Sequence, residues 1–331
     1  METKQAKMVV IVLALALLHL LPLSAKSQDE PRIPISSVPL VISSPGSYYF
    51  IGDLTHTVPD QNAIEVDVNN VTIDLMGFNL IGPGSGSGRG IYIRARSNVE
   101  IRNGTVYNFG GEGIFEAEDF TEESPDYGNG HRVIGFRAVS NGGGGIILNG
   151  WHHLVKDCTV LQNSGFNGIY AGGAATVTGN TVSENEGNGL MAACGSTISG
   201  NTVSENGGRG IILNTSCTVF NNTTAFNALS GIWVWDGCTV NNNTSAGNSI
   251  GITAWGNGNL IKGNTLQYNG DTNIWIGGVS NAVEENLVTF SQQGIYFDKT
   301  GNFYANNRAS GNTNNYVNTA GQTDGGGNVS F

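Results

Sequence analysis

Charged residues are scarce in this chain. They make up 12% of its 331 positions, against about a quarter in an average soluble protein. The charge that is present is mostly negative, with a formal net charge of −11. This balance argues against a nucleic-acid partner, and it disfavours tight binding of a polyanionic sugar unless a cation bridges the two. Glycine, asparagine, serine and threonine take the place of charge, which suits many short strands joined by tight turns.

Long hydrophobic runs are missing after the first 25 residues. The one such run, residues 8–23, follows Lys4 and Lys7 and precedes a small-residue cleavage site ending at Ala25. The pattern predicts a signal peptide over residues 1–25, and hence a protein that is secreted, periplasmic or on the cell surface, with no membrane span after cleavage. The alternative is an uncleaved anchor, but the run is short for a span of about 20 residues.

Cysteine is also rare, with Cys158, Cys194, Cys217 and Cys238 as the only four. An exported chain permits disulfides. Cys217 and Cys238 occupy matching places 21 residues apart, so they could form a bridge or stack as buried thiols. No C-x-x-C spacing indicates a metal site.

What the chain has instead is a repeat. A glycine followed by isoleucine or leucine recurs about every 21 residues, at Gly168, Gly189, Gly210, Gly231 and Gly251. A fixed period of this size indicates a solenoid, in which each repeat stacks on the next. The segments are short, β-branched and without helical period, so we expect an all-β, single-chain parallel β-helix of about eleven coils. We assign residues 26–60 to an N-terminal cap, 61–318 to the β-helix and 319–331 to a C-terminal tail.

Asparagine recurs in columns at the same period. A side-chain amide at a turn can satisfy turn backbone and bond its counterpart one coil away, so we interpret these residues as structural ladders. The main column is Asn180, Asn201, Asn222, Asn243, Asn264, Asn286 and Asn307. A second column runs from Asn141 through Asn163, Asn185, Asn206, Asn227, Asn248 and Asn269 to Asn312.

With its coil length, Gly-Ile steps and asparagine columns, the chain resembles the right-handed parallel β-helix superfamily with the pectate-lyase-like fold. The resemblance covers residues 63–316. It implies a right-handed helix, and it leaves open a choice among polysaccharide lyases, glycoside hydrolases, uronan epimerases, adhesins, tailspikes and a copper-delivery protein. Fold alone does not choose among them.

A row of aromatic residues falls on the strand positions that face away from the core, because side chains alternate along a strand. The candidate substrate-binding residues are Tyr92, Tyr170, Trp233, Trp235, Trp255, Trp275 and Tyr296. An exposed apolar row of this length favours a ligand, and we expect it to stack on sugar rings. The alternatives are burial under the tail or a loop, and a homo-oligomer interface.

The repeat breaks once, between Gly113 and Gly145, where 32 residues separate successive steps. The insertion is rich in carboxylates, and Glu116, Glu118 and Asp119 are candidate Ca²⁺ ligands. A solvated acidic loop is the alternative, since no EF-hand spacing is present. No other cofactor is implied.

Catalytic candidates are few. Asp236 and Asp298 lie near the outward face, but three coils separate them by about 14 Å, too far for a hydrolase pair. His131 and His153 should stack in adjacent coils, in an inward column that favours a structural role. Polygalacturonase-like motifs are absent, so whether the chain is an enzyme stays open.

We therefore expect an exported β-helix protein that binds, and could cleave as a lyase or hydrolase, an extracellular polysaccharide on its aromatic face. The alternative is a non-enzymatic, adhesin-like or structural solenoid with a protein partner on that face. Copper delivery has little support, because only His131, His152 and His153 cluster.

Overall fold

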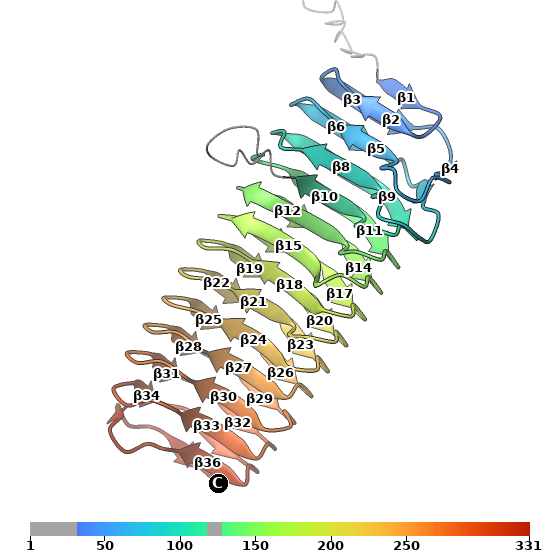
Figure 1. The fold of residues 1–331 in the computed structure, drawn as a ribbon. Helices are drawn as coiled ribbons and strands as arrows, with labels where there is room; N and C mark the ends of the chain where they lie inside the picture. The colour runs from blue at the N-terminus through green and yellow to red at the C-terminus, as the bar shows by residue number, and fades with distance from the viewer. Residues whose placement is uncertain (1–31, 118–127) are drawn as a thin grey trace, which may run out of the picture. The chain divides into compact units, whose positions relative to one another are not determined.

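The computed structural model describes residues 32–117 and 128–331, and within these ranges every regular element is a β-strand. The strands pair in parallel and wind into stacked coils (Figure 1). The expected all-β parallel β-helix is therefore confirmed. The proposed signal peptide, Glu118 and Asp119 lie outside the described residues. No helix in the described ranges meets the length and apolar character that a membrane crossing requires.

One sheet contains a single strand from each coil and has 13 strands in sequence order. We call it the front sheet. Its strands are β2 (Leu40–Ile42), β5 (Ile64–Val66), β8 (Ile91–Arg94), β10 (Ile114–Ala117), β12 (Ile146–Trp151), β15 (Asn167–Gly173), β18 (Asn188–Ala192), β21 (Ile211–Leu213), β24 (Ser230–Val234), β27 (Ile250–Ala254), β30 (Thr272–Ile276), β33 (Gln293–Phe297) and β36 (Asn314–Val317).

The remaining 25 strands form a second sheet made of two columns joined by the long strands β9 (Val99–Tyr107) and β11 (Arg132–Val139). The first column also contains β1 (Ile33–Ile35), β3 (Gly46–Phe50), β6 (Val71–Asp74), β13 (Leu154–Lys156), β16 (Thr176–Thr178), β19 (Thr197–Ser199), β22 (Thr218–Phe220), β25 (Thr239–Asn241), β28 (Leu260–Lys262), β31 (Ala282–Glu284), β34 (Phe303–Ala305) and β37 (Thr323–Asp324). The second also contains β4 (Leu54–Thr55), β7 (Asn79–Ile81), β14 (Thr159–Leu161), β17 (Thr181–Ser183), β20 (Thr202–Ser204), β23 (Thr223–Ala225), β26 (Thr244–Ala246), β29 (Thr265–Gln267), β32 (Leu287–Thr289), β35 (Arg308–Ser310) and β38 (Val329–Ser330).

The coil count differs from the expected eleven, because 13 strands stack in the front sheet. The difference arises at the ends of the helix. Near the N-terminus, Leu40–Ile42 pairs in register with Ile64–Val66 although it carries no Gly-Ile step. Near the C-terminus, β37 and β38 pair with β34 and β35. Both end segments thus contribute strands that continue the coils.

The core lies between the two sheets and is built from alternate residues of each strand. Ile211 and Leu213 are completely buried, and their counterparts one coil on, Ile232 and Val234, are buried as well. Burying an aliphatic side chain of this size stabilises a fold by about 1.5–3 kcal/mol. Repeating it in every coil gives one continuous core, which fixes which side chains must face outward.

The asparagine columns form hydrogen-bonded ladders at the corners of the coils. The side-chain amide of Asn201 donates to the carbonyl of Val177 at 3.0 Å and to Oδ1 of Asn222 at 2.9 Å. Its own Oδ1 accepts from the backbone and the side chain of Asn180, both at 2.9 Å. The residue before it, Gly200, has φ of 64°, which glycine adopts without a Cβ penalty. Each asparagine thus bonds the backbone of the coil before it and the asparagine of the coil after it.

We predict that Asn201→Ala lowers the free energy of unfolding by about 3 kcal/mol or more. It leaves the buried backbone N–H of Asn180 without an acceptor, at about 1–3 kcal/mol, and removes the side-chain hydrogen bonds to Val177, Asn222 and Asn180, at about 0.5–1.5 kcal/mol each. Urea unfolding followed by circular dichroism measures the loss. The exposed Thr202, changed to alanine, is the matched control and should shift the transition little. Equal effects of the two changes would contradict the ladder's role.

Candidate functional site

The expected aromatic row lies on the outer face of the front sheet. Parallel register places Ile212 beside Trp233, Trp233 beside Thr253, and Thr253 beside Trp275. Their strand neighbours Ile232 and Ile274 are completely buried, so Trp233 and Trp275 point away from the core.

Four of the chain's five tryptophans gather on three successive coils, and we call Trp233, Trp235, Trp255 and Trp275 the tryptophan cluster. Trp233 and Trp235 have ring centroids 5.4 Å apart, and Trp255 and Trp275 lie 5.2 Å apart. Trp235 and Trp255 are 41% and 49% exposed, which are large fractions for aromatic side chains. A Cβ at Gly277 would lie 2.8 Å from the Trp275 ring, so the glycine makes room for that ring.

A hollow of about 540 Å³ adjoins the cluster. Its walls are mostly apolar and are formed by Phe166, Met191, Cys194, Arg209, Ile212, Asn214, Thr215, Trp233 and Trp235. We call it the groove. Sequence reasoning missed Arg209, whose guanidinium lies 5.5 Å from the centre of the Trp233 ring. The sequence does contain a signal for it, because Arg209 and Arg89 both stand directly before a Gly-Ile step. In the structure the Arg89 guanidinium likewise lies near a ring of the next coil, 4.3 Å from the centre of the Phe115 ring.

The other expected aromatic residues occupy the same column but lie apart from the groove. Tyr92 stacks on Phe115 with ring centroids 6.2 Å apart. Tyr170 lines a smaller hollow of about 330 Å³. Tyr296 pairs in register with Trp275. The row is therefore continuous in register, while its tryptophans are concentrated on three coils, and two of them, Trp233 and Trp235, line the groove.

The two aspartates near this face are engaged locally. Oδ1 of Asp236 accepts the backbone N–H of Asn257 at 2.7 Å and its side-chain amide at 3.2 Å. Asp298 forms an ion pair with Lys299 at 3.0 Å. Neither carboxylate lines the groove, and among the described residues no hydrogen bond or ion pair joins the two. The structure therefore does not bring them together as a catalytic pair.

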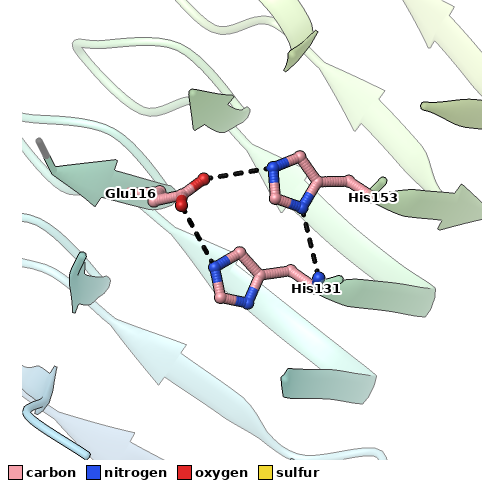
Figure 2. Close-up of side chains that lie close together, drawn as sticks. All are labelled: Glu116, His131 and His153. Carbon is pink, nitrogen blue, oxygen red and sulfur yellow. Dashed lines mark hydrogen bonds and ion pairs between the residues drawn. The ribbon is translucent and has the colours of Figure 1, made fainter. Parts of the chain in front are cut away.

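A second cluster lies inside the coils, where Glu116 faces His131 and His153 (Figure 2). The sequence predicts Glu116 at the start of an acidic loop. It instead belongs to β10 and pairs in register with the buried Ile93, so it is not part of a solvated loop. Its role as a Ca²⁺ ligand stays a prediction. The position two residues after Ile114 faces inward, and the Glu116 side chain is completely buried.

The hydrogen bonds of the two imidazoles indicate where their protons lie. The backbone N–H of Val99 donates to Nδ1 of His131, and the backbone N–H of His131 donates to Nδ1 of His153, each at 3.2 Å. An accepting Nδ1 places the proton of a neutral imidazole on Nε2. Each Nε2 lies 3.3 Å from one oxygen of Glu116, and no described group offers it a better-aligned partner. The backbone N–H of Gly150 donates to the same carboxylate at 3.0 Å.

Both histidines belong to a third ladder that the sequence did not reveal. Farther along the same column, Ser196 accepts the backbone N–H of Ala175, and Cys238 accepts that of Cys217. Asn259 accepts the backbone N–H of Cys238. Most coils place an acceptor here, which is Nδ1 of histidine in two of them and oxygen or sulfur in others, while Ala175 supplies none. Cys217 and Cys238 are free thiols, so stacking rather than a disulfide describes them.

Comparison with known proteins finds a family model that matches part of the chain. Residues 89–250 match a family model described as a right handed beta helix region. No curated protein sequence matches the chain. The match agrees with the right-handed parallel β-helix fold that the sequence resemblance implies.

Several solved structures are similar to this β-helix. The A-module of the Azotobacter vinelandii mannuronan C-5 epimerase AlgE6 is 14% identical with a TM-score of 0.66, over 90% of this chain and 89% of that one. A mutant of the periplasmic alginate epimerase AlgG is 16% identical with a TM-score of 0.60, over 83% and 79%. The Dettilon tailspike protein is 17% identical with a TM-score of 0.56, over 87% and 60%. Identities this low establish the fold alone.

Within the β-helix, the inner cluster holds a carboxylate between two imidazole rings. Burial acts to raise the pKa of Glu116, but hydrogen bonds from His131 and His153 outweigh it and hold that pKa at about 2. Burial lowers the pKa of His153. The carboxylate is therefore ionised near pH 7, and the neutral form of His153 is favoured.

The same three side chains, Glu116, His131 and His153, carry atoms that could bind a metal ion. Oxygen and nitrogen atoms of the three side chains lie within 4.8 Å of one another. However, each Nε2 carries its proton, and the two rings are parallel with centroids 5.0 Å apart. A zinc ion needs unprotonated nitrogens about 2.0–2.1 Å away. The arrangement fits a carboxylate held by two N–H donors better than it fits a bound cation.

We predict that acid destabilises the protein in two steps. Because folding lowers the pKa of His153, its contribution is full above the unfolded value of about 6.5 and is lost as pH falls below it. Glu116 contributes above about 4.5 and loses its contribution as pH falls toward 2. The urea midpoint should therefore fall between pH 7 and pH 5, and again below pH 4.5.

The double variant His131→Asn/His153→Asn tests the first step. Asparagine occupies the same column at Asn259 and Asn281 and supplies both an acceptor and a donor. The fall between pH 7 and pH 5 should shrink in this variant, whereas the exposed His152, changed to asparagine, should leave it unchanged. An identical fall in all three proteins would contradict the assignment.

Proposed function

We propose that this β-helix protein is exported and binds an extracellular polysaccharide on the outer face of the front sheet. The observation that carries the proposal is the tryptophan cluster beside the groove. A monomeric protein seldom leaves such large aromatic side chains together and half-exposed unless they contact a ligand or partner.

The shape of the face suits a sugar polymer. Stacked parallel strands repeat about every 4.8 Å, so ring-bearing positions recur at a spacing close to the size of a sugar ring. Aromatic rings offer flat apolar contact area, while Asn214 and Thr215 offer an amide and a hydroxyl to sugar hydroxyls. A polysaccharide can therefore contact several coils at once, which a small ligand cannot.

The proposal is limited to binding. Glycoside hydrolysis needs two positioned carboxylates about 5–9.5 Å apart, and no residue lining the groove carries one. Asp236 and Asp298 are engaged elsewhere, as described above. His131, His153 and Glu116 are sealed from solvent, so they cannot reach a ligand on the outer face.

The similar structures support the ligand class. Two are named as epimerases of mannuronan or alginate and a third as a tailspike. Their names agree with a polysaccharide ligand and with a protein outside the cytoplasm. The alternative, an adhesin-like solenoid with a protein partner on this face, rests on the same exposed rings.

We predict that Trp233→Ala and Trp275→Ala each weaken polysaccharide binding about tenfold. Losing one stacking ring costs on the order of 1 kcal/mol, and 1.4 kcal/mol is a factor of ten. Affinity electrophoresis in gels containing a panel of polysaccharides measures the effect. Trp151→Ala is the control, because Trp151 is also a solvent-accessible tryptophan, 47% exposed, but stands outside the cluster.

All variants should keep the circular dichroism spectrum and urea midpoint of the parent, since the changed side chains lie outside the core. Binding that persists unaltered in both cluster variants would contradict the proposal. A dimer in light scattering that dissociates on Trp233→Ala, together with no glycan binding, would instead support the protein-partner alternative.

A further inference from the structure

The surroundings of the tryptophan cluster are acidic. Three aspartates border the front sheet near the cluster: Asp236 follows Trp235, Asp271 precedes β30, and Asp298 follows β33, one coil beyond the cluster. The nearby bases offset Asp298 alone. Lys299 is paired with Asp298, and Lys262 lies on β28 of the other sheet.

Lys262 is itself engaged in that sheet. Its Nζ lies 3.4 Å from Glu284 and 3.0 Å from Glu285. It is therefore unavailable to a ligand on the outer face of the front sheet. Of all the residues that line the groove, Arg209 is the one cation.

Arg209 is held against a ring. Its guanidinium lies over Trp233, where attraction to the face of the ring stabilises a cation by about 0.5–1 kcal/mol at an exposed site. One arginine can pair with one carboxylate. A polyuronate carries a carboxylate on every sugar residue, so most of its charges would meet apolar wall or aspartate.

Binding a charged sugar in the groove carries two free-energy costs. Moving a carboxylate from water into an apolar groove without a partner costs several kcal/mol. For carboxylates that come within a Debye length of Asp236 or Asp271, about 8 Å at physiological salt, like-charge repulsion adds to this cost. A neutral sugar ring avoids both penalties and keeps the stacking on the tryptophans.

We infer that the ligand of the tryptophan cluster is a neutral polysaccharide, without carboxylate groups. This inference rests on the proposed function and adds the chemical class of the ligand. It separates the chain from the mannuronan epimerase that shares its fold, since mannuronan is a polymer of uronic acid.

Matched polymer pairs test the inference. Each pair consists of a polyuronate and the same polymer after chemical reduction of its carboxyl groups, so linkage and ring shape are kept while the charge is removed. Pairs with α-(1→4) and β-(1→4) linkages, together with a panel of natural neutral glucans, mannans, galactans and xylans, are placed in affinity gels without divalent cations. The full chain is used throughout.

The reduced polymer or a natural neutral polymer should retard the protein at a concentration at least tenfold below that of the polyuronate. Trp233→Ala should abolish that retardation, while Trp151→Ala, outside the cluster, should leave it unchanged. Tighter binding of the polyuronate, lost in Arg209→Gln, would overturn the inference and leave polysaccharide binding standing. Absence of any retardation that depends on Trp233 would overturn the proposed function as well.

Discussion

The structure depends on one repeated contact, in which a backbone N–H at the corner of one coil donates to a side chain of the next coil. A buried N–H left without an acceptor costs as much as a lost hydrogen bond, so every corner must have one. Asparagine fills the place most often, but serine, cysteine and histidine also occur in the third ladder. What the position requires is an acceptor atom at the right reach, and the residue type varies within that limit.

These corner contacts decide where the outer side chains lie. Because each coil is held in register with the next, residues at one strand position form a straight column across the sheet. Trp233 and Trp275 therefore share a column although 42 residues of chain separate them. Thr253, which lies between them, is small and buried. The ring of Trp255 packs near the ring of Trp275 on the next coil. A ligand face thus follows from a scaffold built for another reason.

Much of the fold and part of the site could be predicted from the sequence. Gly-Ile steps indicated the front strands, and alternation placed Trp233 and Trp275 outward. The first front strand was missed, because Leu40–Ile42 lacks the step and only its pairing with β5 reveals it. Glu116 was misassigned because its sequence neighbours are acidic, while the two histidines that explain its burial come 15 and 37 residues later. Arg209 was overlooked since its relation to Trp233 crosses from one coil to the next.

The amides of the main ladder all point the same way: Asn180 donates to Asn201, Asn201 to Asn222, and so on to Asn307. Such a head-to-tail arrangement has no unique member in its middle. Duplicating or deleting a whole turn of the coil would rejoin equivalent donors and acceptors, so the length of this molecule can change during evolution in units of one turn. Loss of a single residue within a strand would instead move the side chains that follow it in that strand to the opposite face, so a change of one whole turn disturbs the ladders and the core less than the loss of one strand residue.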